Sequence, residues 1–319
     1  MDPCQSRRRG IRRRKFLGVL AVLELYPRLC ASGDAIRPPL VIVVYVSGLE
    51  AYSETVGGLR TRLAGFVPAP VFIDLKSPGA EAELSGLLNT AQPSVVISVG
   101  TEPFGIVSSH KVDGAIVPTM ILRSDRSRGS QFPTGAQRLP SVYLDVPLAS
   151  LLNELRILLP SKSRCGAIRN SVRGDPDPSP PGQVRQQGFT LETALCSRPE
   201  DLVKSFLSLK GKADFVVLFP DSSLYNNTTV RPLILASLES RLPIVGFSSS
   251  FVRAGAALGV YPDFHDVGVQ TADVVQKVIA GKTGLPDESP RKLQVAINQR
   301  VLRLLGLNCN ETPGLVIFR

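Results

Sequence analysis

The sequence lacks the motifs of several common protein classes. It contains two histidines, His110 and His265, and neither has a cysteine nucleophile or a second ligand at metal-binding spacing nearby. No G-x-G-x-x-G follows the first apolar run, and no G-x-S-x-G occurs. No apolar run reaches the roughly 20 residues that span a bilayer. We therefore expect no metal site and no cofactor, and an enzyme on this chain is the least favoured reading.

Cysteine is scarce, and its spacing argues against a disulfide framework. Three of the five cysteines follow residue 35. Cys165 opens one predicted strand and Cys196 ends the next, while Cys309 lies in an irregular tail. Neighbouring parallel strands would place the first two at opposite ends of the sheet, whereas a disulfide needs Cα atoms about 4.4–6.8 Å apart. Buried free thiols are the expectation.

Composition and charge are those of a globular protein with two domains. The chain has 319 residues, of which 43% are hydrophobic and 20% charged. Residues 1–35 hold eight Lys or Arg and three Asp or Glu, so half of the net charge of +10 lies there. The excess of positive charge in the rest of the chain is too small for the dense basic stripe that nucleic-acid binding needs. We therefore expect no nucleic-acid partner.

Residues 1–35 have the pattern of an export signal. A basic run at 7–15 precedes an apolar run at 16–23, and small residues suitable for cleavage follow at 30–35. The run from Arg13 to Leu17 also resembles a twin-arginine signal. We therefore expect a protein that works in the periplasm or elsewhere outside the cytoplasm.

Two features of this leader leave alternatives open. Glu24 and Arg28 interrupt the apolar stretch, so a basic, poorly ordered N-terminus or a misassigned start codon would also explain it. A lipoprotein anchor at Cys30 is disfavoured, because Pro27-Arg28-Leu29 is a poor lipobox.

Strands and helices alternate along the chain at the spacing of βαβ units, which predicts parallel sheets with right-handed crossovers. The pattern runs once over the first part of the chain and restarts near residue 148, so we expect two lobes. Crossovers between them are expected at Tyr143–Val146, around Tyr261 and at Lys292–Gln294. The predicted strands are 40–46, 71–75, 94–99, 115–122, 164–168, 189–194, 213–218, 243–247, 255–261 and 293–297. The predicted helices are 51–64, 80–88, 148–159, 199–209, 230–240, 264–280 and 299–305.

The most informative segment is 243–281. A buried strand, a short polar turn and a strand of small residues lead to an amphipathic helix over 264–280. Asp263 can cap the start of this helix and Gly281 its end. Four of its residues form the apolar face and four others face away from it. The apolar positions are Gly268, Ala272, Val275 and Ile279, and the positions facing away are Gln270, Asp273, Gln276 and Lys277.

This segment resembles the closing part of the periplasmic substrate-binding proteins of ABC importers, in particular the group that includes tryptophan and other amino-acid receptors. The resemblance covers about residues 38–307 in order, including Gly100-Thr101, Leu159-Pro160 and Phe219-Pro220-Asp221. Within the closing segment it is carried by Gly246, Gly255, Ala256, Gly259, Tyr261, Gly268, Ala272 and Gly281.

The resemblance implies two doubly wound, Rossmann-like α/β lobes joined by a hinge, as in type I periplasmic binding proteins. The implied domains are an export signal (1–35), lobe 1 (36–145 with 262–291) and lobe 2 (146–261 with 292–319). The implied function is binding of a small molecule, such as an amino acid or a related compound, for a membrane permease and its ATPase. The protein is expected to be a monomer.

The chain departs from the family pattern in two places. Where the family continues the strand near Ile168 into Asn-Pro and a full helix, a proline-rich loop at 175–181 leaves room for a short helix before Gly188. The tail after Leu307 lacks the family's last helix. Both departures point to a remodelled or lost ligand pocket.

Candidate ligand-binding residues lie at turns that follow buried strands, where open α/β sheets bind ligands. Hydroxyls and helix N-terminal amides suit a carboxylate, a side-chain carboxylate suits an ammonium group, and aromatic rings suit an apolar body. Each polar candidate has a structural alternative as a helix cap or turn residue, and Tyr261 as core. The candidates are Ser47, Tyr52, Thr101, Asp221, Ser222, Ser248, Tyr261 and Asp263, with Phe104 and Tyr225 as further aromatic neighbours.

Three functions remain open from the sequence. The first is the binding protein of an importer. The second is a sensory module of the same fold that signals to a membrane partner, and the third is an α/β enzyme. A neighbouring permease and ATPase would favour the first, a neighbouring histidine kinase the second, and substrate turnover the third.

Overall fold

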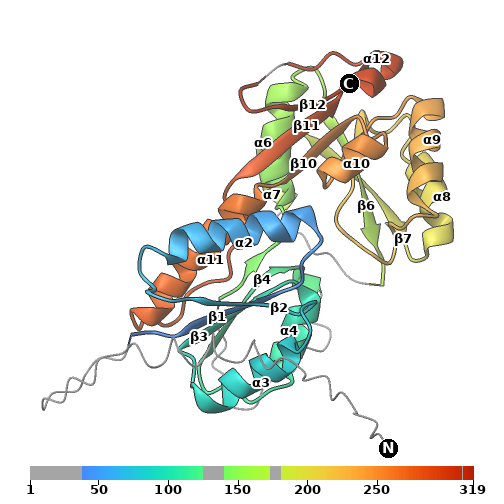
Figure 1. The fold of residues 1–319 in the computed structure, drawn as a ribbon. Helices are drawn as coiled ribbons and strands as arrows, with labels where there is room; N and C mark the ends of the chain where they lie inside the picture. The colour runs from blue at the N-terminus through green and yellow to red at the C-terminus, as the bar shows by residue number, and fades with distance from the viewer. Residues whose placement is uncertain (1–37, 125–139, 173–180, 311) are drawn as a thin grey trace, which may run out of the picture. The chain divides into compact units, whose positions relative to one another are not determined.

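A computed structural model of the chain describes residues 38–124, 140–172, 181–310 and 312–319. The predicted export signal and most of the proline-rich segment 175–181 lie outside these ranges. Within them the strands form two separate sheets, one of five strands and one of seven (Figure 1). We call the first sheet with its helices lobe 1 and the second lobe 2. The predicted fold class is confirmed.

Lobe 1 is a parallel sheet in the order β2-β1-β3-β4-β5. Its strands β1 and β3 consist mostly of β-branched residues that are buried on both faces, as expected for a sheet covered on both sides. The strands are β1 (Val41–Tyr45), β2 (Val71–Asp74), β3 (Val95–Val99), β4 (Ala115–Ile121) and β5 (Val142–Tyr143). The helices are α2 (Glu50–Leu63), α3 (Ala80–Thr90), α4 (Thr101–Ser108) and α11 (Phe264–Ile279). One core lies under α2 and α11 and a second under α3 and α4.

Lobe 2 has the order β12-β11-β10-β9-β8-β6-β7 and is parallel except between β10 and β11. The strands are β6 (Arg164–Asn170), β7 (Thr190–Cys196), β8 (Phe215–Val217), β9 (Ile244–Gly246), β10 (Leu258–Pro262), β11 (Leu293–Asn298) and β12 (Val316–Phe318). The helices are α6 (Leu148–Leu158), α7 (Pro181–Gln186), α8 (Leu202–Leu207), α9 (Val230–Ser240), α10 (Ser249–Ala254) and α12 (Gln299–Leu305). Helices α6, α7 and α12 cover one face, and α8, α9 and α10 the other.

The cysteines behave as the strand register predicts. Cys165 pairs with Leu191 near the start of β7, whereas Cys196 pairs with Asn170 at the end of β6. The three described cysteines are free, and burial raises the pKa of the Cys165 thiol. The expected free thiols are confirmed for this part of the chain.

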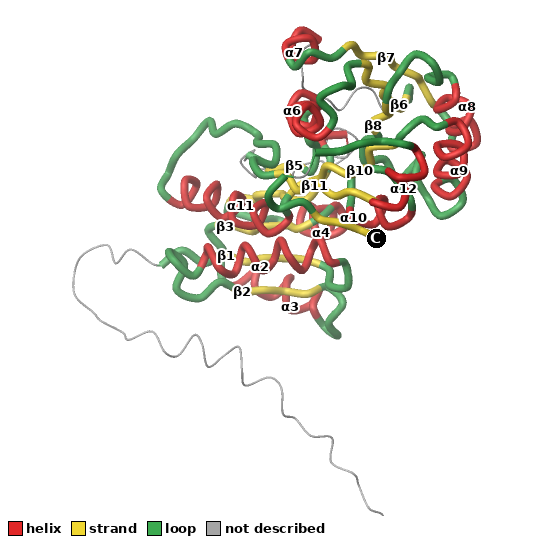
Figure 2. The backbone as a smooth tube through the Cα atoms, turned by 90° about the horizontal axis from the view of Figure 1, so that it is seen from above, coloured by secondary structure: helices red, strands yellow, loops and turns green. Residues whose placement is uncertain are grey.

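Helix α11 packs along α2, far away in the sequence (Figure 2). Two glycines make the approach close: a Cβ on Gly58 would strike the carbonyl oxygen of His265, and one on Gly268 would strike that of Thr55. The Thr55 hydroxyl lies 3.1 Å from the Phe264 carbonyl oxygen, to which it donates. The backbones of α2 and α11 therefore come into contact at these two glycines, where larger side chains would keep the helices apart.

Several local predictions are corrected by the structure. Helix α4 was not predicted, and α10 forms where a polar turn was expected, because the Ser248 hydroxyl accepts from the Phe251 amide and begins the helix. Strand β12 adds to β11 in the tail that was expected to be irregular. Gln270, expected to face solvent, is 3% exposed and donates to Glu288 at 2.7 Å.

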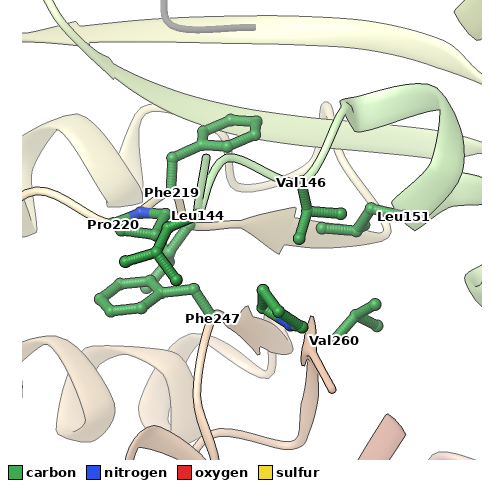
Figure 3. Close-up of a pocket in the computed structure, with 9 residues that line it drawn as sticks. Leu144, Val146, Leu151, Phe219, Pro220, Phe247 and Val260 are labelled. Carbon is green, nitrogen blue, oxygen red and sulfur yellow. The ribbon is translucent and has the colours of Figure 1, made fainter. Parts of the chain in front are cut away.

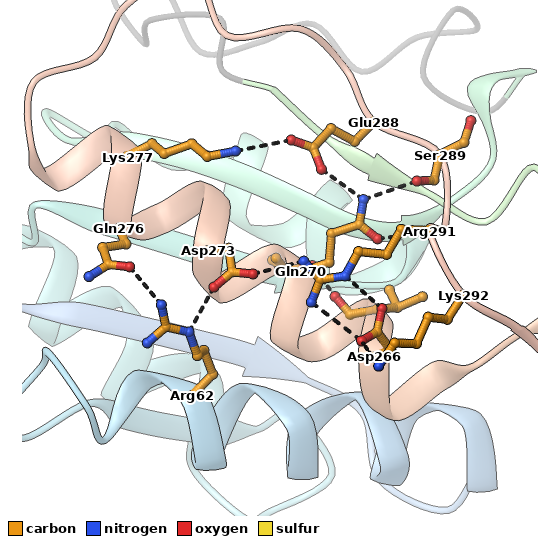
Figure 4. A network of polar contacts seen from close by, with 12 residues as sticks. Arg62, Asp266, Gln270, Asp273, Gln276, Lys277, Glu288, Ser289, Arg291 and Lys292 are labelled. Atoms are coloured by element: carbon orange, nitrogen blue, oxygen red, sulfur yellow. Dashed lines mark hydrogen bonds and ion pairs between the residues drawn. The ribbon is translucent and has the colours of Figure 1, made fainter.

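A network of ion pairs fixes the segment between α11 and β11 onto lobe 1 (Figure 4). Arg291 reaches Asp266 at 2.8 Å and Asp273 at 2.9 Å, and Lys292 reaches Asp266 at 3.1 Å. Arg62 of α2 binds the other side of Asp273 at 2.7 Å. The network therefore joins α2, α11 and the segment that leads into lobe 2.

Asp266 should make this network sensitive to acid. Burial opposes its ionisation, but hydrogen bonds from Arg291 and Lys292 outweigh burial and lower the pKa of the carboxyl. A lowered pKa stabilises the folded protein above the ordinary value, and the stabilisation is lost as the pH falls through the folded value. We expect Asp266→Asn to lower the free energy of unfolding by about 2 kcal/mol at pH 7. The difference should shrink below about pH 4 in urea titrations.

Asp201→Asn is the matched control. Its carboxylate also lies 2.8 Å from an arginine, Arg198, but that pair is exposed. We expect no measurable loss at Asp201, because water screens the pair. An equal loss in both variants, or a loss at Asp266 that persists at pH 2, would contradict the assignment.

Candidate ligand-binding site

The strand orders define one crevice in each lobe. In β2-β1-β3-β4-β5 the order reverses between β1 and β3, and in β7-β6-β8-β9-β10 it reverses between β6 and β8. Loops that leave neighbouring strands in opposite directions open a crevice beyond the carboxyl ends of those strands. The candidate ligand-binding loops are therefore those after β1, β3, β6 and β8.

Three predicted residues lie near the carboxyl ends of β1 and β3 in lobe 1. Ser47 follows β1, and its amide donates to Asp74 at 3.0 Å. Thr101 begins α4 after β3 and is exposed. Tyr52 from α2 lies with its hydroxyl directly against Gly100, whose φ of 98° and lack of a Cβ permit this contact. A hydroxyl, a phenol and a helix N-terminus thus share this edge of the sheet.

The crevice of lobe 2 is bridged by a polar cluster. Asn170, at the end of β6, donates to Asp221 at 2.8 Å and to the Ser223 hydroxyl at 3.0 Å. Asp221 also accepts from the Ser223 amide at 2.8 Å and from its hydroxyl at 2.6 Å. It caps a turn rather than a helix, because α9 begins nine residues later. Ser222 is exposed and makes no hydrogen bond within the described residues.

The other three predicted residues have structural contacts. The Ser248 hydroxyl caps α10, and the Asp263 carboxylate caps α11 by accepting from the Asp266 amide at 3.0 Å. Tyr261 is 3% exposed, and its ring stacks on Phe264 at 6.2 Å. Burial and the Glu54 carboxylate raise the pKa of Tyr261. For these three the structural alternatives considered from the sequence account for the contacts that the structure shows.

Figure 3 shows the residues around an apolar cavity of about 20 Å³, whose wall includes Pro220, the residue before Asp221. Its wall is formed by the crossover after β5, the start of α6, the loops after β8 and β9, and the end of β10. Every lining residue is apolar: Leu144, Val146, Leu151, Leu218, Phe219, Pro220, Phe247, Val260 and Pro262. Because Val260 and Pro262 face the cavity, Tyr261 between them points to the other side of the strand.

One charged group contacts the cavity wall, and three others lie near Tyr261 on the opposite side of β10. The buried Arg169 of β6 places its guanidinium carbon 5.2 Å from the ring of Phe219, a cation–π contact behind the cavity wall. Arg253 of α10 lies 3.5 Å from Glu50 of α2, which links the two lobes by an exposed ion pair. Burial and the Glu50 carboxylate raise the pKa of Glu54.

The sequence analysis missed Asn170 as the partner of Asp221, and it missed the cavity wall. The signal was present, since Phe219 and Phe247 lie within two residues of the ends of β8 and β9. Only polar residues of these two turns were named as candidates.

Comparison with known proteins supports this reading of the fold. Residues 182–313 match the sequence model of the family described as ABC transporter substrate binding protein. A ligand-free, open substrate-binding protein with adhesive properties from Clostridium difficile aligns with a TM-score of 0.63 at 15% identity, covering 88% of this chain and 99% of that one. An ABC domain from Streptococcus pneumonia in complex with L-Trp aligns at 0.56 and 16% identity, covering 88% and 100%.

A conserved domain protein from Vibrio cholerae aligns at 0.55 and 18% identity, covering 89% of this chain and 100% of that one. No curated protein sequence matches the chain. The resemblance drawn from the sequence is confirmed: the chain has the fold of ABC-type substrate-binding proteins, and 182–313 carries the pattern of that family. The family is one of binding proteins rather than enzymes.

Every helix in the part of the chain that the structure describes is too short or too polar to cross a membrane. No group of three or more His, Cys, Asp or Glu side chains there is arranged to hold a metal ion.

Asp221 can be tested for both of its roles. We expect Asp221→Asn to lower the free energy of unfolding by about 1 kcal/mol, because an amide cannot accept all three hydrogen bonds from Asn170 and Ser223. The neighbouring Ser222→Ala should leave stability unchanged. Calorimetric titration with a ligand found by a thermal-shift screen then examines the ligand-binding role that the sequence predicts for Asp221. A loss of about 2–5 kcal/mol in binding would show that Asp221 pairs with a ligand ammonium. Equal affinity in the variant and the unaltered protein would limit Asp221 to its structural role in the turn. An unchanged free energy of unfolding would contradict its hydrogen bonds to Asn170 and Ser223.

Proposed function

We propose that the chain is the extracytoplasmic solute-binding protein of an ABC importer and that it binds a small molecule beside the crossovers between its lobes. The observation that carries the proposal is the apolar cavity, whose wall combines a crossover segment with loops at the carboxyl ends of lobe 2 strands. Strand ends of an open α/β sheet and crossovers between domains are both preferred places for ligand sites.

We further propose that residues 36–145 with 262–291 move as one lobe against 146–261 with 292–319. Two observations support this proposal, the first on the division into lobes and the second on their motion. The segment around Glu288 hydrogen-bonds to Ser141 and Tyr143 in lobe 1, whereas β11, a few residues later, pairs with β10 in lobe 2. The cavity of about 20 Å³ is also close to the roughly 10–15 Å³ that one water needs. Hinge opening would separate these walls and enlarge the space for a solute.

The ligand we propose is an amino acid or a related compound. The apolar residues of the cavity wall would contact its apolar body once the walls have separated. Ser47, Thr101 and Ser222 offer hydroxyls, Tyr52 a phenol and Asp221 a carboxylate for its polar groups. The structural neighbour from Streptococcus pneumonia is a complex with L-Trp, which makes this amino acid the first compound to test. The partners implied are a membrane permease and an ATPase, with the protein acting as a monomer and without nucleic acid.

Binding can be tested at the cavity wall. A thermal-shift screen of the twenty amino acids, purines and small organic anions should find a compound that raises Tm, and calorimetry should give its Kd. We expect Phe247→Ala to raise that Kd at least tenfold, about 1.4 kcal/mol, because the ring is part of the wall. The control Leu304→Ala, on α12 and 62% exposed, should bind as the unaltered protein does. A screen without any hit, or equal affinity in the Phe247 variant, would count against the proposal.

Export is a separate prediction. The basic, apolar and small-residue regions in series support removal of residues 1–35 and a location outside the cytoplasm. Replacing Arg13 and Arg14 with Lys should abolish export if the twin-arginine route is used, as fractionation and immunoblotting would show. Unchanged export would discard that route and leave the general pathway. Intact mass spectrometry that finds Met1 on exported protein would remove the cleavage claim.

A further inference from the structure

Strand β4 contains an irregularity at Met120. This residue has a φ of 58°, in the left-handed region, although it is not glycine, and its side chain is 2% exposed. The register with β5 shifts at the same point, since Thr119 pairs with Val142 and Ile121 pairs with Tyr143. Two steps along β4 thus oppose one step along β5, which defines a β-bulge with Met120 as the extra residue.

The bulge changes which face of the sheet each side chain reaches. Before it, Ile116 belongs to the core under α3 and α4, and Val117 to the core under α2 and α11. Thr119 faces α11, and the hydroxyl of Thr271 on that helix lies 2.9 Å from the Thr119 hydroxyl. Met120 enters that same core, and Ile121 then returns to the opposite one. Strict alternation would place Thr119 and Met120 on opposite faces of the sheet. Because of the bulge, these two adjacent side chains lie on the same face.

Contacts from the bulge lead to both parts of the candidate site. The Thr119 carbonyl accepts from the Gly100 amide at 2.9 Å, at the turn that carries Thr101. The Thr119 hydroxyl donates to the Val142 carbonyl at 3.3 Å. The Ile121 carbonyl accepts from the Leu144 amide at 2.9 Å, and Leu144 lines the cavity. The bulge therefore lies between the crevice of lobe 1 and the first crossover.

We propose that the Met120 bulge is a positioning device for the ligand site, which directs the first crossover so that Leu144 and Val146 form the cavity wall. This inference rests on the proposed binding function. A buried non-glycine residue in the left-handed region carries a conformational cost, and such costs persist where the surrounding structure requires the geometry. Here the requirement is one extra residue in β4, which sets where the chain leaves lobe 1.

Deletion of Met120 tests the extra residue, and Met120→Gly is its matched control. Both variants lose the buried side chain, but the Gly variant keeps the bulge and adopts the left-handed conformation without strain. Hydrogen exchange of the ligand-free protein, read by mass spectrometry, reports the crossover locally. We expect residues 141–150 to exchange at least roughly tenfold faster in the deletion than in the Gly variant. Exchange at 213–219 in β8 should be equal in the two.

A second variant keeps the test decisive if the deletion does not fold. Thr119→Val preserves side-chain volume but removes the hydroxyl that contacts Val142 and Thr271, so exchange over 141–150 should rise about threefold. The control Thr61→Val, on the exposed side of α2, should leave this segment unchanged. Equal exchange over 141–150 in the deletion and Gly variants, or no rise in Thr119→Val, would overturn the proposal. Because no ligand is added, a failure of the proposed binding function leaves this outcome unaffected.

Discussion

The hydrogen bond from Thr55 to the Phe264 carbonyl joins residues 209 positions apart, and the packing of α11 on α2 around it determines the course of the chain. A chain that completes lobe 1 and then builds lobe 2 must return to lobe 1 to place α11 there. It must then cross again to add β11 to β10. Three crossovers follow from this one helix contact, and the apolar cavity lies beside the first two of them.

Backbone proximity and charge stabilise that contact in different ways. At Gly58 and Gly268 the helices approach until peptide groups touch, so dispersion contacts form along the whole crossing. The ion pairs of Arg62 and Arg291 with Asp273 lie at its edge and extend the attachment to the segment before β11. Packing thus fixes the helix, and the network fixes the direction in which the chain leaves it.

The fold was predictable because long buried strands and amphipathic helices carry a visible period. The β-branched runs of β1 and β3, and helices such as α9 and α12, were located from the sequence to within a residue or two. The short helices α4 and α10 were missed because each directly follows a buried strand, where the sequence was interpreted as a turn. Gln270 was misplaced because its partner Glu288 lies on a segment that returns to α11 only in three dimensions.

The candidate site was harder to predict for a related physical reason. In a doubly wound sheet the carboxyl ends of strands are also the starts of helices, so a polar residue there can serve the fold or a ligand. Ser248 and Asp263 cap helices, and the Asp221 carboxylate orders a turn, so much of their hydrogen-bonding capacity is already used. The apolar side chains at the same strand ends make no hydrogen bonds, so capping does not account for their positions. Phe219 and Phe247 are held at the cavity wall by strands that end just before them, and for that reason they mark the site more directly than the polar residues beside them.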